Sequence, residues 1–226
     1  MEYLWHFEVV LQYLPAIIRG LAITVELSLI SIAIALVLGT LLGVARVYAP
    51  NRSIRSALAA LIEVLRAIPK IVLMVWIFYA LPGLGVQLPA FETAVVSLGI
   101  VSAAFIAEIV RAGIEAIPKG QIEAAKSLGM DKLQTIRSIV LPQVFMRNAP
   151  AFMGEFTTSM KDSTLAVIIG VNELMHNVST AAVLSFRPME LYTALGILFL
   201  LIILPISVLS KRLEFKEMTR RTTKRS

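Results

Sequence analysis

The sequence contains no cysteine, and its two histidines, His6 and His176, lie far apart. Disulfide bonds and thiolate metal sites are therefore excluded, and we predict no metal centre. The sequence also lacks the Gly-x-x-x-x-Gly-Lys-[Ser/Thr] pattern of a phosphate-binding P-loop. We therefore expect no catalytic residues and no cofactor in this chain. If ATP drives the protein, another chain must hydrolyse it.

Charged residues are scarce, at 16% of the 226 residues, whereas hydrophobic residues make up 58% and the mean hydropathy is +0.82. A soluble globule of this length is less apolar. About 20 apolar residues cross the core of a bilayer, so the chain has room for about five membrane spans and little else. We predict an all-α polytopic membrane protein that forms one domain over residues 1–226, with spans near 21–47, 56–81, 93–111, 149–171 and 190–210.

Shorter patterns add detail to this prediction. The first span contains Gly39-x-x-x-Gly43, a spacing that permits close packing between membrane helices. Ahead of it, apolar residues recur at helical spacing over residues 3–14, which predicts an amphipathic helix lying in the membrane interface. Three polar residues beside the last two spans are predicted to be exposed in loops or to cap helices: Asn172, Glu173 and Glu190.

Basic residues gather in alternate loops. They follow the first span, lie between the third and fourth spans, and form a tail after the fifth, which contains Lys211, Arg212, Lys216, Arg220, Arg221, Lys224 and Arg225. The positive-inside rule then places the N-terminus outside and the C-terminus in the cytoplasm of a multi-pass protein of the cell inner membrane. The net charge of +6 needs no nucleic acid, because the tail can rest on anionic membrane lipid.

The segment 118–145, here called the polar loop, separates two predicted spans and should lie in water. Pro118 and Gly120 break the preceding helix, and residues 121–128 favour a short helix. Gly129 stands where a helix end needs positive φ. Such an ordered polar segment is predicted to dock onto another protein.

A second short helix is predicted after this turn. Asp131 can cap its start, and Gln134 completes a capping box. We expect this helix to run towards Leu141 and to end at Pro142, because proline disfavours helix in the residue before it.

Charged residues also occur inside the fourth span, where each costs about 2.5–3.5 kcal/mol near the bilayer centre. In a helix, Glu155, Ser159 and Asp162 share one face, whereas Lys161 points about 100° away from Asp162. Lys161 and Asp162 therefore need separate partners. One interpretation is that these four residues bind a zwitterionic amino acid, and the other is that they form interhelical salt bridges.

Two further groups of charges lie in the second and third spans. Glu63, Arg66 and Lys70 share a helical face. Either Glu63 pairs with Arg66 while Lys70 snorkels or pairs with Glu108, or Lys70 forms a positive rim that selects substrates with an extra acidic group. Glu108 and Arg111 are predicted to form an ion pair that orients the polar loop, and a role in gating is the alternative.

Several motifs carry a family resemblance. Glu123-Ala124-Ala125, with Gly129, Ile139 and Leu141-Pro142 at fixed spacing, resembles the EAA motif of permease subunits in ATP-binding-cassette (ABC) importers. Residues 160–165, Met-Lys-Asp-Ser-Thr-Leu, and residues 107–111, Ala-Glu-Ile-Val-Arg, are similar to signatures of the polar amino acid branch, which includes histidine, glutamine and arginine permeases. The resemblance extends from about Gly20 to Glu214. Lys70 departs from it, since an apolar residue is common at that position.

The resemblance implies a function and a set of partners. The chain would form the translocation pathway with a second permease subunit, identical or related, and an extracytoplasmic binding protein would deliver an amino acid. A cytoplasmic ATPase dimer, which holds ATP and Mg²⁺, would bind the coupling helix of the polar loop at Gln121, Glu123, Ala124, Ala125 and Gly129. From the residues alone, an ion-coupled secondary transporter and a non-transporting membrane scaffold are the alternatives.

Overall fold

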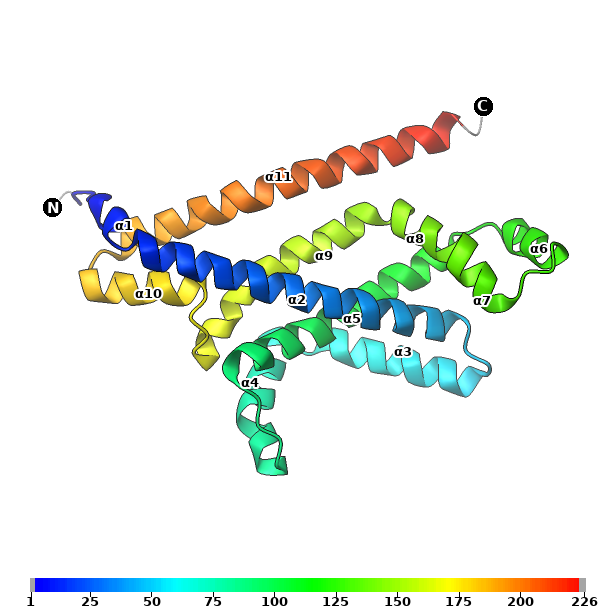
Figure 1. The fold of residues 1–226 in the computed structure, drawn as a ribbon, viewed down its shortest axis with the longest axis horizontal. Coiled ribbons are helices and arrows are strands. Elements are labelled where there is room, and N and C mark those ends of the chain that lie inside the picture. Colours follow the sequence, from blue (N-terminus) through cyan, green and yellow to red (C-terminus); the bar gives the residue numbers. More distant parts are fainter. Residues whose placement is uncertain (1–2, 224–226) are drawn as a thin grey trace. The chain divides into compact units, whose positions relative to one another are not determined.

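The computed structural model describes the backbone of residues 3–223 and the side chains of residues 3–212. Within this range the chain forms helices and no strand (Figure 1). The elements, in chain order, are α1 Glu8–Gln12, α2 Leu14–Val47, α3 Arg52–Ala67, α4 Lys70–Ala80, the 3₁₀ helix η1 Leu81–Leu84, α5 Ala90–Glu115, α6 Lys119–Ser127, α7 Lys132–Thr135, the π-helix η2 Ile136–Val140, α8 Leu141–Arg147, α9 Ala149–Asp162, the 3₁₀ helix η3 Ser163–Ile169, α10 Leu174–Ser185 and α11 Pro188–Thr223.

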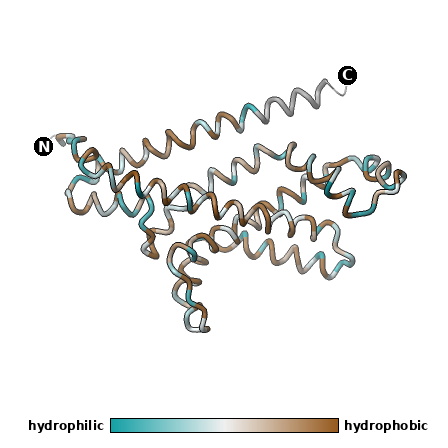
Figure 2. The backbone as a smooth tube through the Cα atoms, in the orientation of Figure 1, coloured by the Kyte–Doolittle hydropathy of each residue, from teal (hydrophilic) through white to brown (hydrophobic). Residues whose placement is uncertain are grey.

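Three described helices are long and apolar enough to cross a membrane: α2, α5 and residues 188–212 of α11. The segment Ala149–Ile169 and helix α10 count as a fourth if they form one span bent by 54°. Figure 2 shows hydrophobic residues along these helices and hydrophilic residues around α6 and α7. The all-α membrane fold is confirmed, whereas the number of five spans stays a prediction. The basic tail beyond Arg212 lies outside the described side chains.

The second predicted span is not one continuous helix. Pro69 stands at the N-terminal cap of α4 with φ −58° and ψ 131°, so the chain leaves the helical conformation between α3 and α4. This is the conformation that proline and its preceding residue favour. Helix α3 buries Ile62, whereas its apolar side chains Leu61 and Val64 are exposed.

The N-terminal helix is shorter than the predicted 3–14, because α1 covers only Glu8–Gln12 and α2 begins at Leu14. The residues before α1 are not helical, and hydrogen bonds to Glu190 hold them in place. The Tyr3 hydroxyl donates to Glu190 Oε2 over 2.6 Å, and the His6 backbone N–H donates to Oε1 over 3.0 Å. Glu190 is completely buried, so of the two alternatives predicted for it the exposed loop residue is wrong. Its carboxylate raises the pKa of the Tyr3 phenol above the usual value.

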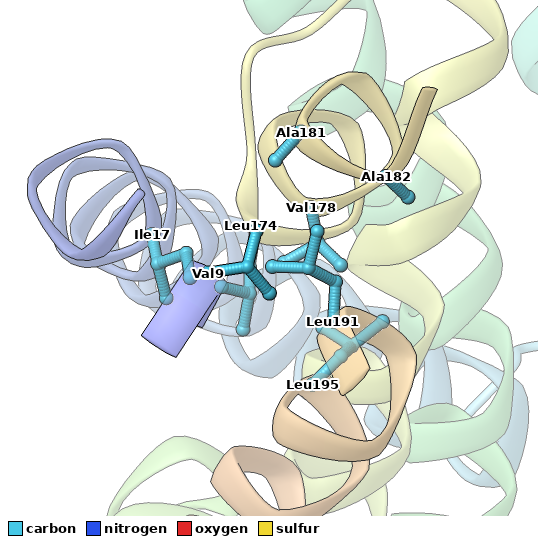
Figure 3. Close-up of a cluster of buried hydrophobic side chains, with 8 residues drawn as sticks. All are labelled: Val9, Ile17, Leu174, Val178, Ala181, Ala182, Leu191 and Leu195. Carbon is cyan, nitrogen blue, oxygen red and sulfur yellow. The ribbon is translucent and has the colours of Figure 1, made fainter. Parts of the chain in front are cut away.

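Glu173 is a buried helix cap rather than an exposed loop residue. Its carboxylate accepts hydrogen bonds from the backbone N–H groups of Met175 and His176, at 2.7 and 2.8 Å, and so begins α10, a helix that the sequence analysis missed. The α10 residues pack with α1, α2 and the start of α11 in a core cluster formed by Val9, Ile17, Leu174, Val178, Ala181, Ala182, Leu191 and Leu195 (Figure 3).

The chain divides into two compact units. The first contains the residues up to 33, 68–99 and 156–206, and includes the core cluster described above. The second contains residues 34–67, 100–155 and those from 207 onward, and includes the polar loop. Helices α2, α5, α9 and α11 contribute residues to both units.

In the second unit, α2 lies directly against α5 at the two glycines of the Gly39-x-x-x-Gly43 motif. A Cβ atom at Gly39 would lie 2.6 Å from the Ala103 carbonyl oxygen, and one at Gly43 would lie 2.6 Å from the Ala107 carbonyl oxygen. Backbone atoms cannot move aside as a flexible side chain can. The predicted close packing is confirmed, and it requires glycine at both positions.

We predict that Gly39→Ala lowers the free energy of unfolding by about 1–3 kcal/mol, because the new methyl group overlaps the α5 backbone. The matched control is Gly196→Ala in α11, where an added Cβ meets nothing within 4 Å. Thermal unfolding of both variants in detergent measures the difference. Equal thermal midpoints for the two variants would contradict this account of the α2–α5 contact.

Candidate functional site

The first helix of the polar loop, α6, ends at a well-formed turn. Gly129 has φ 76°, a left-handed conformation that favours glycine. The Met130 N–H donates to the Ala125 carbonyl over 3.1 Å, and the Gly129 N–H donates to the Lys126 carbonyl over 2.9 Å. These two bonds define a Schellman motif, which satisfies carbonyl groups at the helix end. The predicted helix end at Gly129 is therefore confirmed.

The second helix of the polar loop begins at the predicted capping box. Asp131 Oδ1 accepts from the Gln134 N–H over 2.8 Å, and Gln134 Oε1 accepts from the Asp131 N–H over 3.0 Å. The predicted end of this helix before Pro142 is wrong. The π-turn η2 widens the helix at residues 136–140 and leads directly into α8, which contains Pro142. Such a turn shifts the carbonyl that the proline ring would strike, so the helical path continues.

The polar loop presents an exposed surface. Of the five residues that the resemblance assigns to coupling, Gln121, Glu123, Ala124 and Gly129 are exposed, whereas Ala125 is buried. Two large apolar side chains of the loop face solvent, since Leu128 is 82% and Leu133 is 71% exposed. These two leucines supply apolar surface on an otherwise polar loop. No motif in the sequence marks Leu128 and Leu133 as exposed apolar residues.

An ion-pair network lies at the end of α5 that leads into the polar loop. Glu108 accepts from Arg46 of α2 over 2.7 Å and also from Arg111, one turn further along α5. Arg111 in turn pairs with Glu115. The predicted Glu108–Arg111 pair is confirmed, and Arg46 extends it to a second helix. Because these charges hold one another, the end of α5 is fixed against α2.

All four residues predicted to contact substrate lie in α9, where their helical spacing is as expected. Asp162 pairs with Lys70 at the start of α4, with a Nζ–Oδ2 distance of 2.7 Å. The predicted pairing of Lys70 with Glu108 is therefore wrong, whereas the Glu63–Arg66 pair is confirmed at 3.1 Å. For Asp162, the structure shows an interhelical salt bridge.

The remaining three side chains differ in accessibility. Lys161 is exposed, and its ammonium group meets no hydrogen-bond or ion-pair partner in the described part of the chain. Ser159 is completely buried, and its hydroxyl finds no partner among the described residues. Glu155 is half-buried. Within this chain, therefore, the surface of Lys161 is open and that of Ser159 is covered by neighbouring residues.

The comparisons with known proteins agree with this geometry. The model of the family described as "Binding-protein-dependent transport system inner membrane component" matches residues 35–217, which include the polar loop and α9. The chain belongs to this family.

Individual relatives match this permease over nearly its whole length. It is 33% identical over 211 residues to the probable glutamine ABC transporter permease protein GlnP of Bacillus subtilis (strain 168), covering 91% of this chain and 95% of that one. It is 32% identical over 211 residues to the arginine transport system permease protein ArtQ of the same bacterium, covering 93% and 96%. The crystal structure of an amino acid ABC transporter with histidines matches with a TM-score of 0.83 and 30% identity, over 95% of this chain and 100% of that chain.

These findings fix the class of the protein. It is a multi-pass permease subunit of an ABC importer, and ATP hydrolysis belongs to a separate subunit. The family as a whole works with ATPase and substrate-binding protein partners.

We predict that Lys70→Met lowers the free energy of unfolding of the permease by about 1–3 kcal/mol, because it leaves the Asp162 carboxylate without its partner. Adding Asp162→Asn should recover part of this loss. The control is Lys161→Met, which removes an exposed ammonium group and should leave stability unchanged. Thermal unfolding in detergent gives all three values. Additive effects of the two substitutions would show that the Lys70–Asp162 pair contributes nothing.

Proposed function

We propose that this chain, acting as one permease domain over residues 1–226, forms half of the pathway of an ATP-driven importer for polar amino acids. A second permease subunit, identical or related, supplies the other half. An ATPase dimer with bound ATP and Mg²⁺ docks on the polar loop, and an extracytoplasmic binding protein delivers the substrate. The basic loops favour an outer N-terminus and a cytoplasmic polar loop.

The observation that carries this proposal is the exposed, rigid surface of the polar loop. A Schellman motif ends the first of its short helices and a capping box begins the second, so the helices stay folded when a docked partner moves them. Gln143 of α8 donates to Gln121 of α6 over 2.8 Å, which ties the two sides of the loop together. Leu128 and Leu133 supply exposed apolar surface for the partner to bury.

Movement of the docked loop would reach the membrane helices through α5. The Arg46–Glu108–Arg111 network ties the end of this helix to α2. ATP-driven closure of the ATPase pair would therefore move α2 and α5 together and rock the pathway between its outward-facing and inward-facing states. Such rigid-body motion exposes groups that one state keeps closed, which would open the way to Ser159.

The substrate proposal rests on α9 and on the named relatives. Lys161 offers an exposed ammonium group to a carboxylate, and Glu155 would receive the substrate's ammonium group. The Asp162 carboxylate is already paired with Lys70. Asp162 would therefore bind the substrate together with Lys161 and Glu155 rather than by itself. The two Bacillus subtilis relatives are named for glutamine and arginine, so we propose a polar amino acid or a close analogue. A secondary transporter or a scaffold would have no need of the docking surface.

We expect Glu123→Arg to leave membrane insertion intact and to abolish stable association with the ATPase. The reversed charge would lie on the exposed face of α6, where the partner docks. The matched control is Glu92→Arg, the same change at an exposed position in the first turn of α5. Co-purification of the ATPase with each variant measures the effect. Undiminished association of Glu123→Arg would mean that the polar loop is not the docking element.

Lys161→Met should lower the rate of amino acid uptake by about tenfold or more, because it removes the charge proposed to bind the substrate carboxylate. Uptake of labelled glutamine and arginine by reconstituted vesicles is the readout, and ATPase association shows that assembly is intact. Arg19→Met, which also removes an exposed positive charge, is the control and should transport normally. Full uptake by the Lys161 variant would refute its role in the pathway.

A further inference from the structure

Beyond the polar loop and α9, the second unit contains a cavity to which the proposed function assigns no ligand. Its volume is about 310 Å³, and it opens between the end of α2, the start of α3 and the end of α5. We call it the arginine pocket, since three arginines line it. The complete lining is Arg46, Val47, Arg55, Ser56, Ala59, Arg111 and Glu115.

The charges around the arginine pocket leave one cation without a counter-charge. Arg46 and Arg111 bind Glu108, and Arg111 also binds Glu115, so these two arginines and two carboxylates balance. The Arg55 guanidinium forms no hydrogen bond or ion pair with any residue whose side chain is described, and Arg55 is exposed. The pocket therefore carries a net charge of +1, which comes from Arg55.

The donors of the arginine pocket suit a tetrahedral oxyanion. A guanidinium group carries five N–H donors, and the links of Arg46 and Arg111 to Glu108 and Glu115 use only some of them. The Ser56 hydroxyl adds a further donor to the wall. Arginine binds phosphate well because its planar fork can donate to two oxygens at once.

The position of the arginine pocket favours a lipid as the source of the phosphate. It lies at the ends of two membrane helices, α2 and α5, where headgroups meet the protein. Large apolar side chains of the adjoining helices are exposed, including Leu41 of α2 and Ile54 and Leu61 of α3. Acyl chains can pack against such residues while a headgroup occupies the basic pocket.

We propose that the arginine pocket binds a phosphate group, supplied by the headgroup of an anionic phospholipid. Arg55 attracts the anion, Arg46 and Arg111 donate to its oxygens, and Ser56 completes the contact. Since Arg46 and Arg111 also fix α5 against α2, a bound headgroup would strengthen the connection between these helices. The proposal depends neither on the substrate nor on the docking surface proposed above.

The test measures lipid binding to the intact purified transporter after delipidation, using native mass spectrometry with added phosphatidylglycerol. Arg55→Gln should weaken binding about fivefold, as expected for about 1 kcal/mol per basic residue near a charged lipid. The matched control is Arg52→Gln, an exposed arginine in the same first turn of α3 that does not line the pocket. It should bind phosphatidylglycerol as the wild type does.

Further measurements distinguish a lipid headgroup from free phosphate as the ligand. Inorganic phosphate should compete only at concentrations far above those of the lipid, and zwitterionic phosphatidylcholine should bind weakly. Saturation by inorganic phosphate alone, dependent on Arg55 and unaffected by the lipid, would reject the headgroup as the ligand. Equal losses in the Arg52 and Arg55 variants would overturn the site, because they indicate diffuse surface attraction. Ser56→Glu, which places a carboxylate in the pocket, provides a second variant that should also weaken binding.

Discussion

The close contact between α2 and α5 is the constraint on which the polar loop depends. The helices meet because Gly39 and Gly43 place no side chain against the α5 backbone. Just beyond this contact, Arg46 reaches across to Glu108, which also holds Arg111. The end of α5 is therefore fixed where the chain turns into α6. A docked partner that pushes on α6 would act on a braced helix rather than on a flexible connection.

Charges in this apolar protein fall into two groups. One group is paired, since an isolated charge within a membrane is costly. The Lys70–Asp162 bridge joins α4 to α9, and the buried Glu190 carboxylate holds the N-terminal segment. Lys161 and Arg55, by contrast, are exposed and meet no counter-charge within the described side chains. Paired charges account for the architecture. Among the exposed cations without a counter-charge, which also include Arg19 and Arg52, Lys161 and Arg55 are those to which we assign ligands.

Local sequence signals predicted local structure well. Gly129 and Asp131 set the ends of the short helices in the polar loop because each acts through its own backbone neighbours. Contacts between residues far apart in the sequence could not be predicted in this way. Lys70 and Asp162 are 92 positions apart, and no spacing rule connects them. The predicted helix end before Pro142 was wrong because the local rule did not take the π-turn into account. The rule that a helix ends before proline holds for a regular α-helix, and the π-turn ahead of it removes the clash.

The central claim is that this permease works with a separate ATPase that docks on the polar loop. The most direct test is affinity purification of the tagged chain from its native membrane in mild detergent, followed by identification and quantification of the proteins that accompany it. We predict a P-loop ATPase in a one-to-one ratio with the permease, together with either a second copy of this chain or a related permease. A homo-oligomer without an ATPase would contradict the account.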